Sequence, residues 1–194
     1  MRNFKLTIKV FFAALFASAA CTTTTANLHY ADTIHGDTTY FASTQQLKSD
    51  RIPDSVFRLI DLRHLSINGM DCDYGDRINC WMLKEIPSDI KNLKKLTSLR
   101  LTLNAITTIP MEMTELDSLT LIDLTDNAAL TDIYNLTKLP NLQYLYLNGC
   151  GLTKLPDNIR DLKNLKELGL VGNHIDKKEM AIIQNELPNC NIKF

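Results

Sequence analysis

The chain has 194 residues, a formal net charge of −1 at pH 7 and 22% charged residues. A mildly acidic chain without a basic stripe is poorly suited to the dense negative charge of nucleic acid, so we expect no nucleic-acid partner. The first apolar run, over residues 10–20, is too short to span a bilayer, and no later run is long enough to do so.

Residues 1–20 have the layout of a secretory signal peptide. A basic start precedes the apolar run, which ends in small residues. Ser18-Ala19-Ala20-Cys21 then resembles a bacterial lipobox, which implies that Cys21 is lipidated and that the protein is held at the outer membrane or cell surface. The alternative is ordinary cleavage after Ala19 or Ala20, which would leave a soluble periplasmic or secreted protein.

The next segment, 21–45, is Thr-rich and has no hydrophobic periodicity. We expect it to be a tether or a loosely packed leader. The main domain is expected to cover residues 46–194.

A repeat dominates this domain. Asn104, Asn127, Cys150 and Asn173 follow one another at intervals of 23 residues, and the same spacing of leucines surrounds each of them. One copy reads Leu-x-x-Leu-x-Leu-x-x-Asn-x-Ile-x-x-Ile-Pro over 96–110, and a later copy over 142–156 carries Cys150 in place of Asn. A fixed period of this length predicts a solenoid, here with about five units.

These residues resemble the leucine-rich repeat family, in its short variety with Ile-Pro or Leu-Pro on the outer side. The resemblance implies an α/β solenoid with parallel strands on the concave face and short helical or irregular turns on the convex face. In each Leu-x-x-Leu-x-Leu segment the last two leucines alternate with polar residues, as in a strand with one buried face. Because no unit can bury its leucines alone, stacked units share one core.

The intervening strand positions are expected to face solvent and to carry the partner-binding residues. These are Arg100, Leu121, Asp123, Tyr144 and Tyr146. Tyrosine and arginine are enriched at the centres of protein interfaces. The alternative is that an exposed strand face must carry some side chains, and tyrosine favours strands in any case.

An insertion of 11 residues at about 71–81 lengthens one interval to 34. Cys72 and Cys80 are the best candidates for a disulfide, which export would permit. Tyr74 and Trp81 would then be presented to a partner, or alternatively Trp81 packs into the core. The Asp residues of this insertion lack the ligand set of an EF-hand, so no metal site is expected.

The C-terminal residues 176–194 are expected to cap the solenoid. Asp176 and Glu179 have the spacing of a capping box that opens a helix, and Met180, Ile183 and Leu187 recur on one side of it. Cys150 and Cys190 are expected to be buried thiols.

Nothing in the sequence predicts an enzyme or a cofactor, because phosphate-binding loops and spaced metal ligands are absent. The favoured function is a non-catalytic protein-binding module of the bacterial envelope that uses the concave face and the 71–81 loop. The alternatives are a structural envelope lipoprotein without a dedicated ligand, and a carbohydrate-binding module.

Overall fold

The computed structural model describes residues 31–34, 37–69 and 80–194. The signal peptide, the lipidation of Cys21 and the positions of Cys72 and Tyr74 lie outside these residues. The pairing of Cys72 with Cys80 therefore also stays a prediction.

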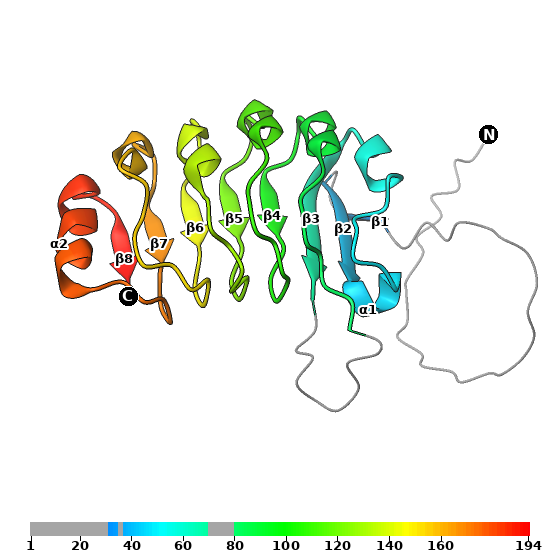
Figure 1. Cartoon of the computed structure of the whole chain (residues 1–194). Coiled ribbons are helices and arrows are strands. Elements are labelled where there is room, and N and C mark those ends of the chain that lie inside the picture. Colours follow the sequence, from blue (N-terminus) through cyan, green and yellow to red (C-terminus); the bar gives the residue numbers. More distant parts are fainter. Residues whose placement is uncertain (1–30, 35–36, 70–79) are drawn as a thin grey trace, which may run out of the picture.

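One sheet organises the described part of the chain, and its strands lie side by side in sequence order (Figure 1). The first two strands, β1 (Ala31–Ile34) and β2 (Asp37–Ser43), are antiparallel to each other. From β2 onward every neighbouring pair is parallel. The remaining strands are β3 (Leu62–Asn68), β4 (Ser98–Arg100), β5 (Leu121–Asp123), β6 (Tyr144–Tyr146), β7 (Glu167–Gly169) and β8 (Asn191–Lys193).

Short 3-10 helices form the outer turn of each unit, which confirms the expected solenoid. In two units a proline, Pro87 or Pro110, is the residue before the helix and has extended backbone angles. Proline suits this position because its φ is fixed and it has no N–H to leave unpaired. The 3-10 helices are η1 (Val56–Arg58), η3 (Ser88–Asn92), η4 (Met111–Glu115), η5 (Tyr134–Lys138) and η6 (Ile159–Asp161).

The core is a continuous column of aliphatic side chains between the sheet and the outer turns. The three apolar positions of each Leu-x-x-Leu-x-Leu segment are buried in all five units, as the repeat predicts. They are Leu62, Leu65, Ile67, Leu96, Leu99, Leu101, Leu119, Ile122, Leu124, Leu142, Leu145, Leu147, Leu165, Leu168 and Leu170.

At the N-terminal end the sheet begins earlier than the predicted boundary at residue 46. β1 and β2 both lie inside the segment that the sequence predicts to be a tether. In β2, Tyr40 and Ala42 are buried whereas Phe41 is exposed, so this strand does follow a period of two. Ser43 then caps the short helix α1 (Thr44–Leu47) in a reciprocal capping box with Gln46. The Thr-rich composition hid β2, because threonine is polar yet favours strands.

The C-terminal end is covered by helix α2 (Lys177–Glu186), followed by β8 (Figure 1). Asp176 accepts the backbone N–H of Glu179 at 2.8 Å, so the predicted N-cap is present. The reciprocal half of the predicted capping box is replaced, because the Glu179 carboxylate accepts the N–H of Leu155 at 3.3 Å instead. Ile183 and Leu187 are buried against the last unit. None of the helices in the described ranges is long and apolar enough to cross a membrane.

Candidate functional site

The solvent-facing positions of the sheet, which we call the concave face, are aligned in rows across the strands. One row contains His64, Ser98, Leu121, Tyr144 and Glu167. The next contains Ser66, Arg100, Asp123, Tyr146 and Gly169. Because parallel strands lie about 4.8 Å apart, successive members of a row are neighbours. The structure thus brings all five predicted binding residues of the strands together.

Arg100 and Asp123 are partners in the register of β4 and β5. Arg100 is exposed and Asp123 is half-buried. Neither forms an ion pair within the described residues. An oxygen of Asp123 instead accepts the backbone N–H of Thr125 at 3.1 Å. The guanidinium of Arg100 is therefore exposed and without an ion-pair partner among the described residues.

Tyr146 belongs to a polar cluster at the C-terminal side of the same face. Lys193 donates to the Glu167 carboxylate at 2.7 Å, and this hydrogen bond lowers the pKa of Glu167. Burial raises the pKa of the Tyr146 phenol, and the neighbouring Glu167 carboxylate raises it further. Tyr146 thus remains a neutral phenol, with its ring beside Asp123.

The concave face also includes a residue that the sequence prediction missed. Phe41 of β2 pairs with Ser66 of β3 and so extends the row of Arg100 and Asp123. Its side chain is 59% exposed, which is high for a phenylalanine on a sheet. The signal was the alternation of residues 38–43, which lay within the predicted tether.

A third row consists of hydroxyl and amide side chains at the ends of the strands. Thr102 donates to Asn68 at 2.9 Å, and Asn148 donates to Thr125 at 3.4 Å. The Asn148 oxygen also accepts the N–H of Val171 at 3.0 Å. These bonds link neighbouring units, so this row stabilises the concave face.

Trp81, the remaining described residue of the predicted binding set, stands where the insertion rejoins the solenoid. Its side chain is half-buried, and its carbonyl accepts a hydrogen bond from the Thr44 hydroxyl. It therefore joins the N-terminal cap to the following unit, and only part of its ring is available for contact.

The repeated asparagines lie in the turns below the strands and bind backbone groups of two units. Asn127 donates to the carbonyls of Leu101 and Leu124, both at 2.8 Å, and accepts the N–H of Ile106 at 3.0 Å. Asn104 and Asn173 make the corresponding sets of bonds. Cys150 takes the same place, and its thiol donates to the Leu124 carbonyl at a sulfur–oxygen distance of 3.2 Å.

The two described thiols outside the insertion both have raised pKa values. Burial raises the pKa of Cys150 to about 11, and burial likewise raises that of Cys190 to about 11. A thiolate is the reactive form, so neither is a nucleophile near neutral pH. Cys150 is buried as expected, whereas Cys190 is only half-buried because it lies in the turn between α2 and β8.

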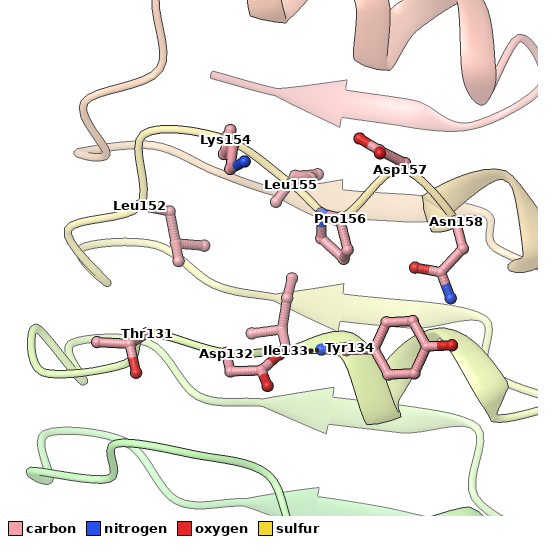
Figure 2. Close-up of a pocket in the computed structure, with 10 residues that line it drawn as sticks. All are labelled: Thr131, Asp132, Ile133, Tyr134, Leu152, Lys154, Leu155, Pro156, Asp157 and Asn158. Carbon is pink, nitrogen blue, oxygen red and sulfur yellow. Dashed lines mark hydrogen bonds between the residues drawn. The ribbon is translucent and has the colours of Figure 1, made fainter.

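The outer wall has a hollow of about 540 Å³, shown in Figure 2. One side is formed by 131–134, and the other by Leu152 and 154–158. Tyr134 stands at its edge with 47% of its surface exposed, and Lys138 stacks on the ring at 4.5 Å from the ring centroid. Sequence reasoning did not predict this hollow.

The comparisons with known proteins agree with this geometry. Residues 140–179 match the family described as Leucine Rich repeats (2 copies). A leucine-rich repeat protein of Leptospira interrogans is similar in structure, with a TM-score of 0.65, 32% sequence identity and 74% of this chain covered. This molecule is a leucine-rich repeat protein.

Two other solved structures are similar at lower identity. An internalin of Listeria monocytogenes shares the fold at 18% identity, with a TM-score of 0.54, 74% of this chain covered and 40% of that chain. The Arabidopsis receptor kinase HAESA, solved in complex with the peptide hormone IDA and the co-receptor SERK1, has a TM-score of 0.50 and 28% identity over 69% of this chain and 20% of that one. This leucine-rich repeat protein spans about 34% of the length of the Leptospira protein. A search of curated proteins gives no match.

The leucine-rich repeat fold is usually non-catalytic, and the comparisons find no enzyme family. His64 and Ser66 share the concave face, but Asp61, the nearby carboxylate, is paired with Lys95 at 2.6 Å. The described part of this leucine-rich repeat protein contains no group of three or more His, Cys, Asp or Glu side chains placed to hold a metal ion.

Proposed function

We propose that this leucine-rich repeat protein is a non-catalytic recognition module that binds a protein partner through its concave face. Leucine-rich repeat domains commonly bind proteins, and a continuous row of solvent-facing side chains suits that function. The receptor kinase HAESA, one of the similar structures, was solved with a peptide hormone and a co-receptor, which supports a protein or peptide as the ligand class here.

The observation that carries the proposal is the convergence of Arg100, Asp123 and Tyr146 in one row, with Leu121 and Tyr144 in the row beside it. Arginine and tyrosine supply large contact area, and an unpaired guanidinium gives a partner carboxylate a bidentate anchor. Leu121 and the tyrosine rings supply apolar area around these charges.

The test is a pull-down from envelope and host extracts with the mature protein as bait. The variant is Arg100→Glu/Tyr146→Ala, and the matched control is Arg58→Glu/Tyr134→Ala, which makes the same chemical changes at exposed residues on the outer side. Circular dichroism verifies the fold of each bait. A partner kept by the wild type and the control and lost by the concave variant supports the proposal. The same proteins captured by all three baits, or no specific capture, would overturn it.

The 71–81 loop is proposed as a secondary contact at the edge of the concave face. We propose that Tyr74 and Trp81 add to binding, and that a Cys72–Cys80 disulfide restricts the loop and lowers the entropy cost of that contact. Reduction of the captured complex with dithiothreitol should then weaken binding of the wild type and leave a Cys72→Ser/Cys80→Ser variant unchanged. Equal loss of binding by both proteins would contradict the contribution of the disulfide.

The proposed place of action is the outer membrane or cell surface, through lipidation of Cys21. The sequence around Cys21 supports this, because acyl chains would hold the domain at a bilayer without a spanning helix. Cells grown with labelled palmitate should label the wild-type protein and not a Cys21→Ser variant. A wild-type protein that is exported without label would show that it is a soluble periplasmic or secreted protein.

A further inference from the structure

Neighbouring units are joined below the strands by a recurring pair of hydrogen bonds. In the first such junction the N–H of Leu83 donates to Asn104, at 2.9 Å, and the N–H of Ala105 donates back to the Leu83 carbonyl, at 2.8 Å. Near the C-terminus the N–H of Leu152 donates to Asn173, at 2.9 Å, and His174 donates to Leu152, at 2.8 Å. Each junction thus joins two loops with one side-chain bond and one backbone bond.

The junction between the second and third units keeps this pattern with a small shift. The N–H of Ile106 donates to Asn127, at 3.0 Å, and the N–H of Thr131 donates to the Thr107 carbonyl, at 2.9 Å. The shift arises because one extra residue lies at 128–129.

The junction between loop 128–134 and loop 150–157, which we call the seam, is different. No hydrogen bond joins these two loops within the described structure. The N–H of Leu130 turns back to the Asn127 carbonyl, at 2.9 Å, because of the extra residue. On the other side of the seam, Cys150 has no oxygen with which to accept an N–H. The extra residue and Cys150 therefore lie at the same junction. The extra residue removes the donor of the expected hydrogen bond, and Cys150 removes its acceptor.

The seam also coincides with the hollow of the outer wall (Figure 2). Residues 131–134 line it from one unit, and Leu152 and 154–158 from the next. Two independent features, the missing bonds and the open volume, thus mark the same boundary. Away from the seam the two units are connected by the paired strands β5 and β6, the thiol of Cys150, and side-chain bonds from Asn148 to Thr125, Asn158 to Thr137 and Asn164 to the Pro140 carbonyl.

We propose that the seam is a hinge, at which the C-terminal block, residues 142–194, opens and closes relative to the N-terminal block. A solenoid is held together by the contacts between neighbouring units, so its weakest junction determines where it opens first. Arg100 and Asp123 lie on one side of this hinge, and Tyr144 and Tyr146 on the other. Opening therefore changes the spacing within the concave face, whether or not that face binds a protein.

The experiment is hydrogen exchange of the full chain, followed residue by residue by NMR. The structure supplies three matched pairs of amides that cross successive strand boundaries. Leu101 and Leu103 donate from the β4 unit to the β5 unit, Leu124 and Asp126 donate from the β5 unit to the β6 unit, and Leu147 and Gly149 donate from the β6 unit to the β7 unit. Protection factors correct for the different intrinsic rates of these residues.

A hinge at the seam predicts that Leu124 and Asp126 exchange roughly three- to tenfold faster than both other pairs. Fraying from the C-terminal end cannot produce this order, because it would expose Leu147 and Gly149 first. Protection that falls steadily from Leu101 to Gly149, or equal protection in all three pairs, would overturn the proposal.

Two variants test the cause. Deletion of Ala129 combined with Cys150→Asn restores the regular junction, and it should slow exchange at Leu124 and Asp126 to the rate of the other pairs. The converse change, Asn127→Cys, removes the accepting oxygen from a regular junction and should speed exchange at Leu101 and Leu103. If neither variant changes the hydrogen-exchange rates of these amides, the missing hydrogen bonds do not create a hinge.

Discussion

At the scale of single residues, the turn after each strand imposes the same backbone conformation on unrelated side chains. Leu103, Asp126, Gly149 and Gly172 occupy equivalent positions, and all have a φ between 55° and 76°. This left-handed region favours glycine, and other residues adopt it at a cost. The protein tolerates Leu103 and Asp126 there because the strands on either side hold the turn.

Gly69, just before the insertion, is restricted by space. A Cβ added to Gly69 would lie 1.5 Å from the carbonyl oxygen of Leu103. Gly69→Ala should therefore lower the free energy of unfolding by about 1–3 kcal/mol, since backbone must move to accommodate the methyl group. Urea denaturation of the variant and the wild type measures this.

Gly172→Ala is the matched control for Gly69→Ala. A Cβ at Gly172 meets no atom closer than 3.6 Å, so this change adds only the backbone cost of a φ of 76°. Gly172→Ala should lower the free energy of unfolding by about 1 kcal/mol. If Gly172→Ala lowers the free energy of unfolding more than Gly69→Ala does, the close approach of Leu103 does not restrict the size of the side chain at residue 69.

The cluster of Tyr146, Glu167 and Lys193 has a defined pH dependence. The hydrogen bond from Lys193 lowers the pKa of Glu167 below the ordinary value of a glutamate. A carboxylate whose pKa is lower in the folded state stabilises the fold above its unfolded pKa, and that contribution is lost as the pH falls through the folded pKa. Lys193→Gln should therefore raise the pKa of Glu167, which an NMR titration of its side-chain carbonyl measures.

The side chain of Glu115 is a convenient internal reference in that titration. Its pKa is lowered by Lys94, in a pair that does not touch Lys193. Its titration should be the same in the wild type and in Lys193→Gln. An unchanged pKa of Glu167 in the variant would show that the Glu167–Lys193 pair does not persist in solution.

At the scale of elements, the sequence predicted the strands well and their connections less well. The leucine spacing predicted five strands and their solvent-facing side chains, because a period of two must follow when one face of a strand is buried. It could not reveal β2, since threonine and tyrosine in 38–43 are compatible with both a strand and a polar leader. Nor could it show that the extra residue at 128–129 and Cys150 lie opposite each other, because they belong to different units.

The equivalence of Cys150 to the asparagines predicts, from sequence alone, that Cys150→Asn is tolerated. The structure confirms the equivalence, because Cys150 and Asn127 both donate to a carbonyl 26 residues earlier. It nevertheless changes the expected result, because the Leu130 N–H, the donor that would correspond to those of the regular junctions, is already bonded to the Asn127 carbonyl. A buried acceptor left unpaired costs about 1–3 kcal/mol, so Cys150→Asn should lower the melting temperature.

A double-mutant cycle isolates this effect. Deletion of Ala129 restores the loop length that brings the Leu130 N–H toward residue 150. The deletion and Cys150→Asn should each destabilise alone, and together they should cost less than the sum of the two, by about 1 kcal/mol or more. Additive costs would mean that the loop and residue 150 do not interact.

At the scale of the whole molecule, the main contacts of each described unit are with its neighbours along the solenoid. The order of strands in the sheet is the order in the chain, and the two ends are closed by separate structures, β1–β2 with α1 and α2 with β8. Stability is then approximately a sum over units and junctions. The number of units can change as long as the remaining ones stay in register.

Deletion of residues 119–141 tests this additivity. The segment is 23 residues long, and its removal joins Ser118 to Leu142 in the register of the repeat. The shortened protein should remain folded and less stable than the wild type, as measured by circular dichroism and thermal unfolding. Loss of cooperative unfolding would show that the stability depends on contacts beyond neighbouring units.

Deletion of residues 119–141 should also reverse the direction in which Cys150→Asn changes the melting temperature. The loop at 105–110 would then face residue 150, and its Ile106 N–H would need the oxygen that cysteine lacks. Cys150→Asn should therefore raise the melting temperature of the shortened protein, whereas it lowers that of the full chain. The same sign in both backgrounds would contradict the account of the junctions.

The uniform spacing of 23 residues also has an evolutionary consequence. A duplication or loss of one unit within the gene keeps every leucine on its proper face, so chain length can vary without redesign of either cap. An irregular unit such as the one at 119–141 is harder to copy, because each duplicate would bring another weak junction with it.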